Sequence, residues 1–428
     1  MVYAVFSDRR GNIFEDQRLG LMGRLGRHLV RLRESDLIEL PEGSDFFFMP
    51  DDRMVGWDLK QDQPKITGKN PVAVFLPPGY TRTYLPAAVR SPAGNILPQW
   101  AYTACGFLED RMVAAAIQTD QNPFWDPLLV DPDEVRSKAS QRRDRMPRNR
   151  IVNQLWTCAV QHGCMSARNY FLERHEAAIP VSPACNASCV GCLSWQPEES
   201  CVPSHDRITF LPSVEEIVEI AVPHLEGGGQ RIVSFGQGCE GDPLLAAGTI
   251  EEAIREIRSK TQAGTLNMNT NGSLPEAFER LCQAGLDSVR ISTNSAVPET
   301  YVKYYRPAGY DFDAVRKSME IAKKNGLFLS INLLTFPGIT DEKNEANTIL
   351  TLCRESKVDL VQVRNLNIDP ELYLDLFPDL QESECIGIRS LVEELAKIHG
   401  LAVGNFNRPK EQWNLTKGHP ALQDCPDA

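Results

Sequence analysis

Short apolar runs alternate with longer amphipathic stretches from about residue 178 to residue 400 of the chain. In the longer stretches, apolar residues recur three and four positions apart, which is the spacing of one helix face, whereas the short runs have the length of buried strands. A repeated order of strand and then helix is typical of a parallel sheet. Six such units predict an α/β fold, a partial (β/α)6 TIM-like barrel.

The elements of these units can be placed by residue number. The expected strands are Ala178–Pro183, Arg231–Phe235, Thr265–Asn269, Ser288–Ser292, Phe328–Leu334 and Leu360–Arg364. The expected helices are Val214–His224, Ile250–Thr261, Pro275–Ala284, Phe312–Lys324, Lys343–Glu355 and Glu382–His399. A further apolar run, Leu401–Phe406, is expected either to add an edge strand or to close the end of the barrel.

The first 130 residues follow a different pattern. Short β-type runs such as Met1–Phe6, Asp45–Met49 and Pro71–Leu76 are separated by turn clusters, and few helical periods occur. We therefore expect a β-rich N-terminal domain, in which no sequence motif indicates a ligand. The chain is expected to divide into four segments: the β-rich domain over residues 1–130, a basic and helical connector over 131–177, the barrel over 178–370, and a C-terminal helix and tail over 371–428.

The connector contains a basic stretch, with seven Lys and Arg residues between Arg136 and Arg150. A charge run of this kind is typical of a solvated linker, and contact with phosphates is the alternative. The connector also contains four potential metal ligands: Cys158, His162, Cys164 and His175. Their spacing lacks the paired Cys-x2-Cys of structural zinc sites, so buried thiols and ordinary histidines are expected.

Charge and cysteine content narrow the possible partners. The chain has 45 Lys and Arg against 57 Asp and Glu, a net charge of -12, which disfavours nucleic acid because phosphate backbones bind basic faces. Asp8 interrupts the N-terminus before a signal peptide could form, and the apolar runs are far shorter than the ~20 residues of a membrane-spanning helix. We therefore expect a cytoplasmic protein without a membrane partner, whose 12 cysteines are thiols or metal ligands.

The most informative motif is a cysteine triplet directly after the first expected strand. Cys185, Cys189 and Cys192 form a Cys-x3-Cys-x2-Cys run within one loop. Such a loop can hold three corners of a 4Fe-4S cluster and leave the fourth iron without a protein ligand, whereas structural zinc is closed by four ligands. The alternatives are a zinc site or a closed electron-transfer cluster, with Cys201 or His205 as the fourth ligand.

The triplet resembles the signature of the radical S-adenosylmethionine (SAM) superfamily, in which the same spacing follows the first strand. One position departs from the pattern. Many members have an aromatic residue before the third cysteine to pack on the adenine, and this chain has Gly191 there. The resemblance then requires another nucleoside contact, for which Trp195 is the candidate.

The loop after the second strand is similar to the superfamily's Gly-Gly-Glu-Pro motif, which grips the amino group of SAM. Gly238 and Gly241 let the backbone approach a ligand closely, and Glu240 or Asp242 would supply the acidic contact. Cys239 lies within this loop and is a candidate hydrogen donor or nucleophile, with a packed thiol as the alternative.

Polar residues also follow the next two strands. Asn269 and Asn271 belong to a segment that resembles the superfamily's Thr-Asn-Gly segment, and a plain turn is the alternative. Ser292 and Asn294 occupy the place where the superfamily often puts contacts to the ribose and the carboxylate, and both would also serve as helix caps. All four are expected to bind the cofactor.

The last candidate cofactor-binding residues are Asn332 and Arg364, on the fifth and sixth strands. Polar groups at the ends of buried strands are hard to explain by packing, because a buried polar group without a partner costs ~1–3 kcal/mol. The resemblance covers residues 178–370 and leaves the remainder of the chain unassigned.

The resemblance implies a 4Fe-4S cluster and SAM as cofactors. The open iron would chelate the amino and carboxylate groups of SAM, whose reductive cleavage yields a 5'-deoxyadenosyl radical that abstracts hydrogen from a small-molecule or peptide substrate. It also implies a flavodoxin or ferredoxin type of electron donor. Two other classes stay open: an iron-sulfur electron carrier or redox sensor, and a structural zinc protein. The β-rich domain could cap the barrel mouth and select the substrate.

Overall fold

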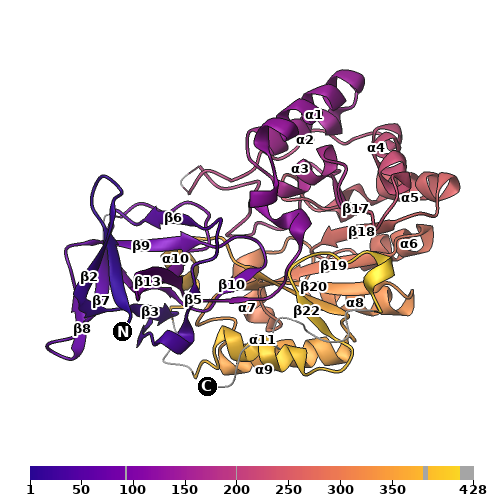
Figure 1. Cartoon of the computed structure of the whole chain (residues 1–428). Coiled ribbons are helices and arrows are strands. Elements are labelled where there is room, and N and C mark those ends of the chain that lie inside the picture. The colour runs from indigo at the N-terminus through magenta and orange to yellow at the C-terminus, as the bar shows by residue number, and fades with distance from the viewer. Residues whose placement is uncertain (92–93, 199, 379–383, 415–428) are drawn as a thin grey trace.

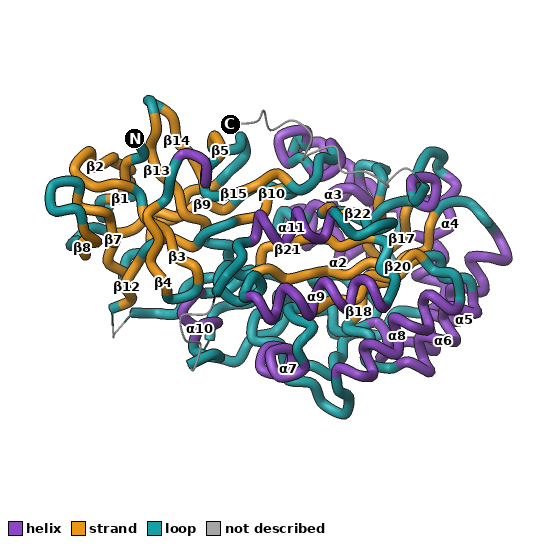
Figure 2. The backbone as a smooth tube through the Cα atoms, turned by 90° about the horizontal axis from the view of Figure 1, so that it is seen from below, coloured by secondary structure: helices purple, strands orange, loops and turns teal. Residues whose placement is uncertain are grey.

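The computed structural model describes residues 1–91, 94–198, 200–378 and 384–414. A β-rich region formed by the N-terminal part of the chain lies beside an α/β region formed by the rest, as Figures 1 and 2 show from two directions. The parallel strands lie at the centre of the α/β region, and helices cover their outer side (Figure 1).

The β-rich region is built almost entirely from antiparallel pairs. Its strands are β1 (Tyr3–Ser7), β2 (Ile13–Gly20), β3 (Met22–Leu25), β4 (His28–Arg31), β5 (Ile38–Glu39), β6 (Asp45–Phe48), β7 (Asp52–Asp58), β8 (Gln63–Ile66), β9 (Asn70–Phe75), β10 (Tyr80–Arg82), β11 (Leu85–Pro86), β12 (Ala88–Arg90), β13 (Thr103–Leu108), β14 (Arg111–Ala114) and β15 (Ala116–Gln118). All of them lie before residue 130, and they bury several small apolar clusters rather than one large core.

The α/β region contains a parallel sheet whose strand order follows the chain order throughout. Its strands are β16 (Glu176–Ile179), β17 (Ile232–Phe235), β18 (Thr265–Thr270), β19 (Ser288–Thr293), β20 (Phe328–Thr335), β21 (Leu360–Asn365) and β22 (Ala402–Gly404). No pairing joins β22 back to β16 within the described residues, so the sheet is an open, partial barrel. The Asn407 amide crosses this open side and donates to Glu176 Oε1 at 2.8 Å.

Helices connect the strands, as the periodicity predicts. They are α4 (Val214–Glu226), α5 (Ala247–Lys260), α6 (Pro275–Ala284), α7 (Pro298–Tyr305), α8 (Phe312–Lys324), α9 (Lys343–Glu355), α10 (Pro370–Leu374) and α11 (Ile388–Ala396). The helices and the sheet share one large apolar core. The partial barrel is therefore confirmed, and the run at Leu401–Phe406 adds the edge strand β22.

Three details differ from the sequence expectations. The first strand ends at Ile179, four residues earlier than expected, because the chain after it turns into the cysteine loop. The short helix α7 was not expected, and its buried tyrosines pack beside that loop. Residues 382–383, where the last helix was expected to begin, lie outside the described residues, and the helix there starts at Ile388.

The basic stretch is largely helical and is not a linker, but five of its seven cations are exposed, as expected for a solvated charge run. Residues Pro132–Arg145 form helix α1, which is followed by α2 (Arg150–Val160) and α3 (Met165–Phe171). Arg143 stacks 4.3 Å over the Trp156 ring of α2, and Arg150 pairs with Glu216 of α4 at 2.6 Å. The second contact ties the connector to a helix of the barrel.

The β-rich region and the barrel are joined by buried polar contacts. The Arg82 side chain of β10 is fully buried and donates to the Leu366 carbonyl at 2.9 Å, while its backbone N–H donates to Asn365 Oδ1 at 2.9 Å. The turn after β3 makes a second contact, in which the Gly26 N–H donates to the Pro337 carbonyl at 2.9 Å. None of the helices in the described ranges is long and apolar enough to cross a membrane.

Candidate active site

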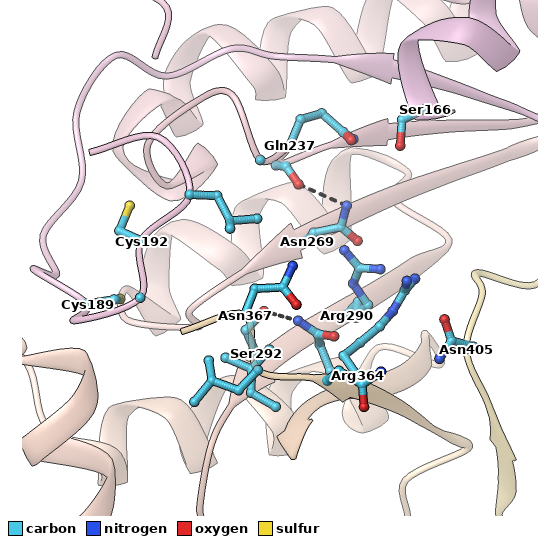
Figure 3. A pocket seen from close by; sticks show the side chains of 18 of the residues that line it. Ser166, Cys189, Cys192, Gln237, Asn269, Arg290, Ser292, Arg364, Asn367 and Asn405 are labelled. Atoms are coloured by element: carbon cyan, nitrogen blue, oxygen red, sulfur yellow. Dashed lines mark hydrogen bonds between the residues drawn. The ribbon is translucent and has the colours of Figure 1, made fainter. Parts of the chain in front are cut away.

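A cavity of about 500 Å³ lies at the carboxyl ends of the parallel strands. Loops of the β-rich region form one of its walls, through Phe75–Tyr80 and Trp125. Figure 3 shows Cys189 and Cys192 at one end of the cavity and Arg290, Arg364 and Asn405 at the other. Most of the residues expected to bind cofactors line this cavity: Cys185, Cys189, Cys192, Gly238, Gly241, Asp242, Asn269, Asn271, Ser292, Asn332 and Arg364.

The three thiols of the triplet are half-buried, and all three residues line the cavity. Burial raises the pKa of Cys189 well above its usual value, and the charges of Cys192 and Cys185 raise it further. Burial also raises the pKa of Cys185, to about 11. Within the described residues, no three His, Cys, Asp or Glu side chains are spaced to hold a single metal ion.

Helix α7 supports the cysteine loop. The backbone N–H groups of Ser188 and Val190 donate to the carbonyls of Tyr305 and Tyr304, each at 3.0 Å. A Cβ at Gly191 would stand 2.9 Å from the Tyr304 hydroxyl, so this glycine makes room for the Tyr304 ring. Tyr304 lines the cavity, whereas Trp195 is 45% exposed and is not among its lining residues. An aromatic side chain from another element therefore lies beside the position before the third cysteine.

One cation contacts the triplet directly. The Arg207 guanidinium donates from Nη2 to Cys192 Sγ at 3.3 Å and from Nε to the Ser194 hydroxyl at 3.1 Å. A positive hydrogen-bond donor on a ligating sulfur stabilises negative charge there. Sequence reasoning missed Arg207, because nothing in the local pattern shows that this residue, 15 positions after Cys192, returns to it.

Glu240 does not face the cavity but joins the two loops that form its wall. Its buried carboxylate accepts the N–H groups of Val181 at 2.7 Å, Ser182 at 2.8 Å and Gln237 at 2.6 Å. Burial raises the pKa of Glu240 to about 8, which the three N–H donors partly oppose. Glu240 therefore positions the loops and is not placed to hold an ammonium group in the cavity.

Asp242 lines the cavity, yet its carboxylate is largely occupied by the protein. Thr270 Oγ1 and the Leu244 N–H donate to Oδ1 at 2.8 and 3.0 Å, and the Asn271 N–H donates to Oδ2 at 2.7 Å. A carboxylate offers about four acceptor sites, so little of it remains for a ligand. By accepting these hydrogen bonds, Asp242 fixes the loop after β18 in the cavity wall.

Two other candidates lie outside the cavity lining. Cys239 is 4% exposed, and its thiol shares a hydrogen bond with that of Cys158, which together with burial raises the pKa of Cys239 well above its usual value. A protonated, buried thiol has neither the access nor the charge of a nucleophile. Asn294 is also buried and donates to the Tyr373 hydroxyl at 3.1 Å. Neither residue is placed to touch a ligand.

The remaining asparagines and the serine hold the strand ends together. Asn269 Nδ2 donates to the Gly236 carbonyl at 2.9 Å, and Asn332 Nδ2 donates to the Ser292 hydroxyl at 3.2 Å (Figure 3). Asn271 Nδ2 donates to Asn186 Oδ1, inside the cysteine loop, at 2.9 Å. The N-cap of helix α7 is Val297, so Ser292 does not cap it.

Residues 179–347 match the family model of the radical SAM superfamily. This part of the chain is therefore similar to the radical SAM domain, and enzymes of that class use a 4Fe-4S cluster and SAM. Over 253 residues it is 29% identical to "Probable GTP 3',8-cyclase" of Methanococcus maripaludis, a match that spans 56% of this chain and 78% of the relative.

Two further likenesses are more partial. The chain is 28% identical over 208 residues to "FeMo cofactor biosynthesis protein NifB" of Rhizobium meliloti, which spans 44% of this chain and 40% of that protein. Among solved structures, the hydrogenase maturase HydG shares 14% identity with a TM-score of 0.38, over 66% of this chain and 64% of its own.

The residues at the cysteine end of the cavity fit the cofactors of this class. Three neighbouring thiols face a common space, and an arginine donates to one of them. An aromatic ring and several backbone groups border the same space without filling it. Thiolates are the protein ligands of iron-sulfur clusters, and a donor to the sulfur is a common way to tune them.

Proposed function

We propose that this enzyme holds a 4Fe-4S cluster through Cys185, Cys189 and Cys192 and cleaves SAM reductively to start a radical reaction on a small-molecule or peptide substrate. The observation that carries the proposal is the convergence of these three thiols at one end of a cavity large enough for a ligand. When bound, the cluster supplies the electron that converts SAM to methionine and a 5'-deoxyadenosyl radical.

The protein's own part is to position SAM and to exclude water. Tyr304 offers an aromatic face beside the cysteine loop, and we assign it the adenine contact that Trp195 cannot make from its exposed place. Gly238, Gly241 and Asp242 would present backbone to the amino acid part of SAM, and Ser292 and Asn332 would face its ribose. Glu240, outside the cavity lining, holds these loops together by accepting the N–H groups of Val181 and Gln237.

The β-rich region is proposed to complete the substrate site. Its residues Phe75–Tyr80 and Trp125 form a wall of the cavity that no barrel strand supplies. We keep the division into residues 1–130, 131–177, 178–370 and 371–428 as a proposal for the domain organisation. A flavodoxin or ferredoxin type of protein is the proposed electron donor.

Anaerobic reconstitution tests the proposal. We expect the wild-type protein to bind iron and sulfide and to release 5'-deoxyadenosine and methionine in equal amounts when incubated with dithionite and SAM. A protein that binds iron and sulfide but releases no 5'-deoxyadenosine would be an electron carrier. A protein that binds zinc and no sulfide would contradict the proposal entirely.

Replacing Arg207 by methionine is expected to make the cluster harder to reduce. The substitution removes a positive charge and a donor 3.3 Å from Cys192 Sγ, and both favour the reduced, more negative cluster. A redox titration followed by electron paramagnetic resonance should give a lower midpoint potential for Arg207→Met. Arg207→Lys, which keeps the charge, should fall between the two. Equal potentials in all three proteins would show that this contact does not tune the cluster.

A further inference from the structure

The end of the cavity opposite the cysteines contains two arginines. Arg290 lies on β19 and Arg364 on β21, and their side chains lie together in Figure 3. Both residues line the cavity. Burial lowers the pKa of Arg364 to about 9, and the charge of Arg290 contributes to that shift. The two guanidinium groups therefore share one poorly solvated space.

Neither guanidinium is satisfied by the protein. Arg290 donates from Nη1 to Gln362 Oε1 at 3.0 Å, but its buried Nε has no partner within the described residues. The structure gives the Arg364 side chain a contact with the Phe406 ring, 5.7 Å from its centroid, and no hydrogen bond in the same described part of the chain. A guanidinium has five N–H donors, so most of those at this end of the cavity are available to a ligand.

The nearby carboxylates do not neutralise the pair. Asp120 is engaged by Arg408 at 2.7 Å, so these two charges cancel. Glu176 lines the cavity, and its Oε1 is taken by Ser234 and Asn407, which leaves one negative charge against two guanidinium groups. Burying an uncompensated cation is costly, and a bound anion would offset that cost.

The carboxylate of SAM is not expected to be the anion that binds between Arg290 and Arg364. In the proposed function that carboxylate binds at the open iron, beside the cysteines and at the far end of the cavity from the arginines (Figure 3). The cavity has a volume of about 500 Å³, within the range of small-molecule pockets, and the arginines lie at the end away from the cysteines (Figure 3). Their position therefore suits a molecule other than SAM.

We propose that the substrate of this enzyme is a small molecule with a carboxylate or phosphate group, which binds between Arg290 and Arg364. That this anion is the substrate of a radical reaction rests on the proposed function. That an anion binds between the two arginines does not. Arg364, which sequence reasoning placed among the SAM contacts, is thereby reassigned to the substrate.

Titration of the anaerobically reconstituted, SAM-bound enzyme with inorganic phosphate and with succinate, at constant ionic strength, tests the proposal. We expect calorimetry to detect binding of at least one of the two anions. Arg364→Gln and Arg290→Gln should each weaken that binding by about tenfold to a hundredfold, since a hydrogen bond to a charged group contributes that much. The matched control is Arg354→Gln, on the exposed face of α9, which should bind the anion as the wild type does.

The two anions separate the two sources of negative charge: tighter binding of phosphate points to a phosphorylated substrate and tighter binding of succinate to a carboxylic acid. Failure of both anions to bind the wild-type enzyme overturns the proposal, and so does unchanged binding in either arginine variant. Release of 5'-deoxyadenosine by the wild type is measured separately. If that release is absent while the anion still binds, the proposed function fails and the anion site stands.

Discussion

Replacing Cys189 by alanine is expected to abolish cluster binding and to reduce the release of 5'-deoxyadenosine to the background without enzyme. Cys189 is the central ligand of the triplet, and its thiol is the one raised in pKa by both neighbours. Removing one of three thiolates leaves two irons without protein ligands, and the cleavage of SAM has no other source of its electron. Iron and sulfide analysis, together with chromatography of the nucleoside product, measures both effects. Cys185→Ala and Cys192→Ala should behave in the same way.

Cys201→Ala is the matched control for the cysteine variants. Cys201 is half-buried, near the same loop, but it does not line the cavity, and the Ser200 hydroxyl contacts its sulfur at 4.0 Å. We expect full cluster content and full cleavage activity in this variant. If the cluster content fell as it does in Cys189→Ala, the cluster would have four protein ligands, and the open iron that SAM requires would not exist.

Gly241→Ala is expected to displace the cysteine loop and to damage both stability and activity. A Cβ at this position would stand 1.8 Å from the Ala184 carbonyl oxygen and 3.0 Å from the Cys185 backbone nitrogen. Both neighbours are backbone atoms, so the cysteine loop itself would have to move. Overpacking of this kind costs about 1–3 kcal/mol of unfolding free energy. Displacing the loop by about 1 Å should also slow SAM cleavage by roughly a hundredfold.

Gly248→Ala provides the comparison, since it adds the same methyl group seven residues later, in helix α5. A Cβ there meets no atom within 4 Å. Alanine replaces glycine in a helix with a gain of about 1 kcal/mol, so this variant should be slightly more stable and equally active. Urea unfolding and the rate of 5'-deoxyadenosine release measure the two variants in parallel. Equal stabilities would show that the two loops are not packed as closely as the structure has them.

The barrel was predictable because its strands and helices carry strong periodic patterns. Helices α6, α8 and α9 begin and end at the expected residues. The cysteines and the polar residues at the strand ends were also predictable, because a parallel sheet brings all of its carboxyl ends to one edge. For the same reason, Asn269 and Asn332 could be assigned to one cavity although 63 positions separate them in the sequence.

The errors arise where contacts between distant segments decide the outcome. The proposed aromatic contact, Tyr304, lies beside position 191 only because α7 packs against the cysteine loop. Glu240 was expected to face the cofactor, yet its nearest donors are backbone groups behind the loop. The single signal available in advance was Gly191 itself, because a small residue in an aromatic position implies a ring from elsewhere.

The junction at Arg82 has a consequence for how the protein melts. The fully buried guanidinium of this β-rich residue donates to the Leu366 carbonyl of the barrel, and the Asn365 side chain of the barrel binds backbone groups of β10 in return. If either region unfolded alone, the hydrogen bonds at Arg82 and Asn365 would break, and the buried surface between the two regions would be exposed to water. The two regions should therefore denature together, in one cooperative transition with a shared midpoint temperature.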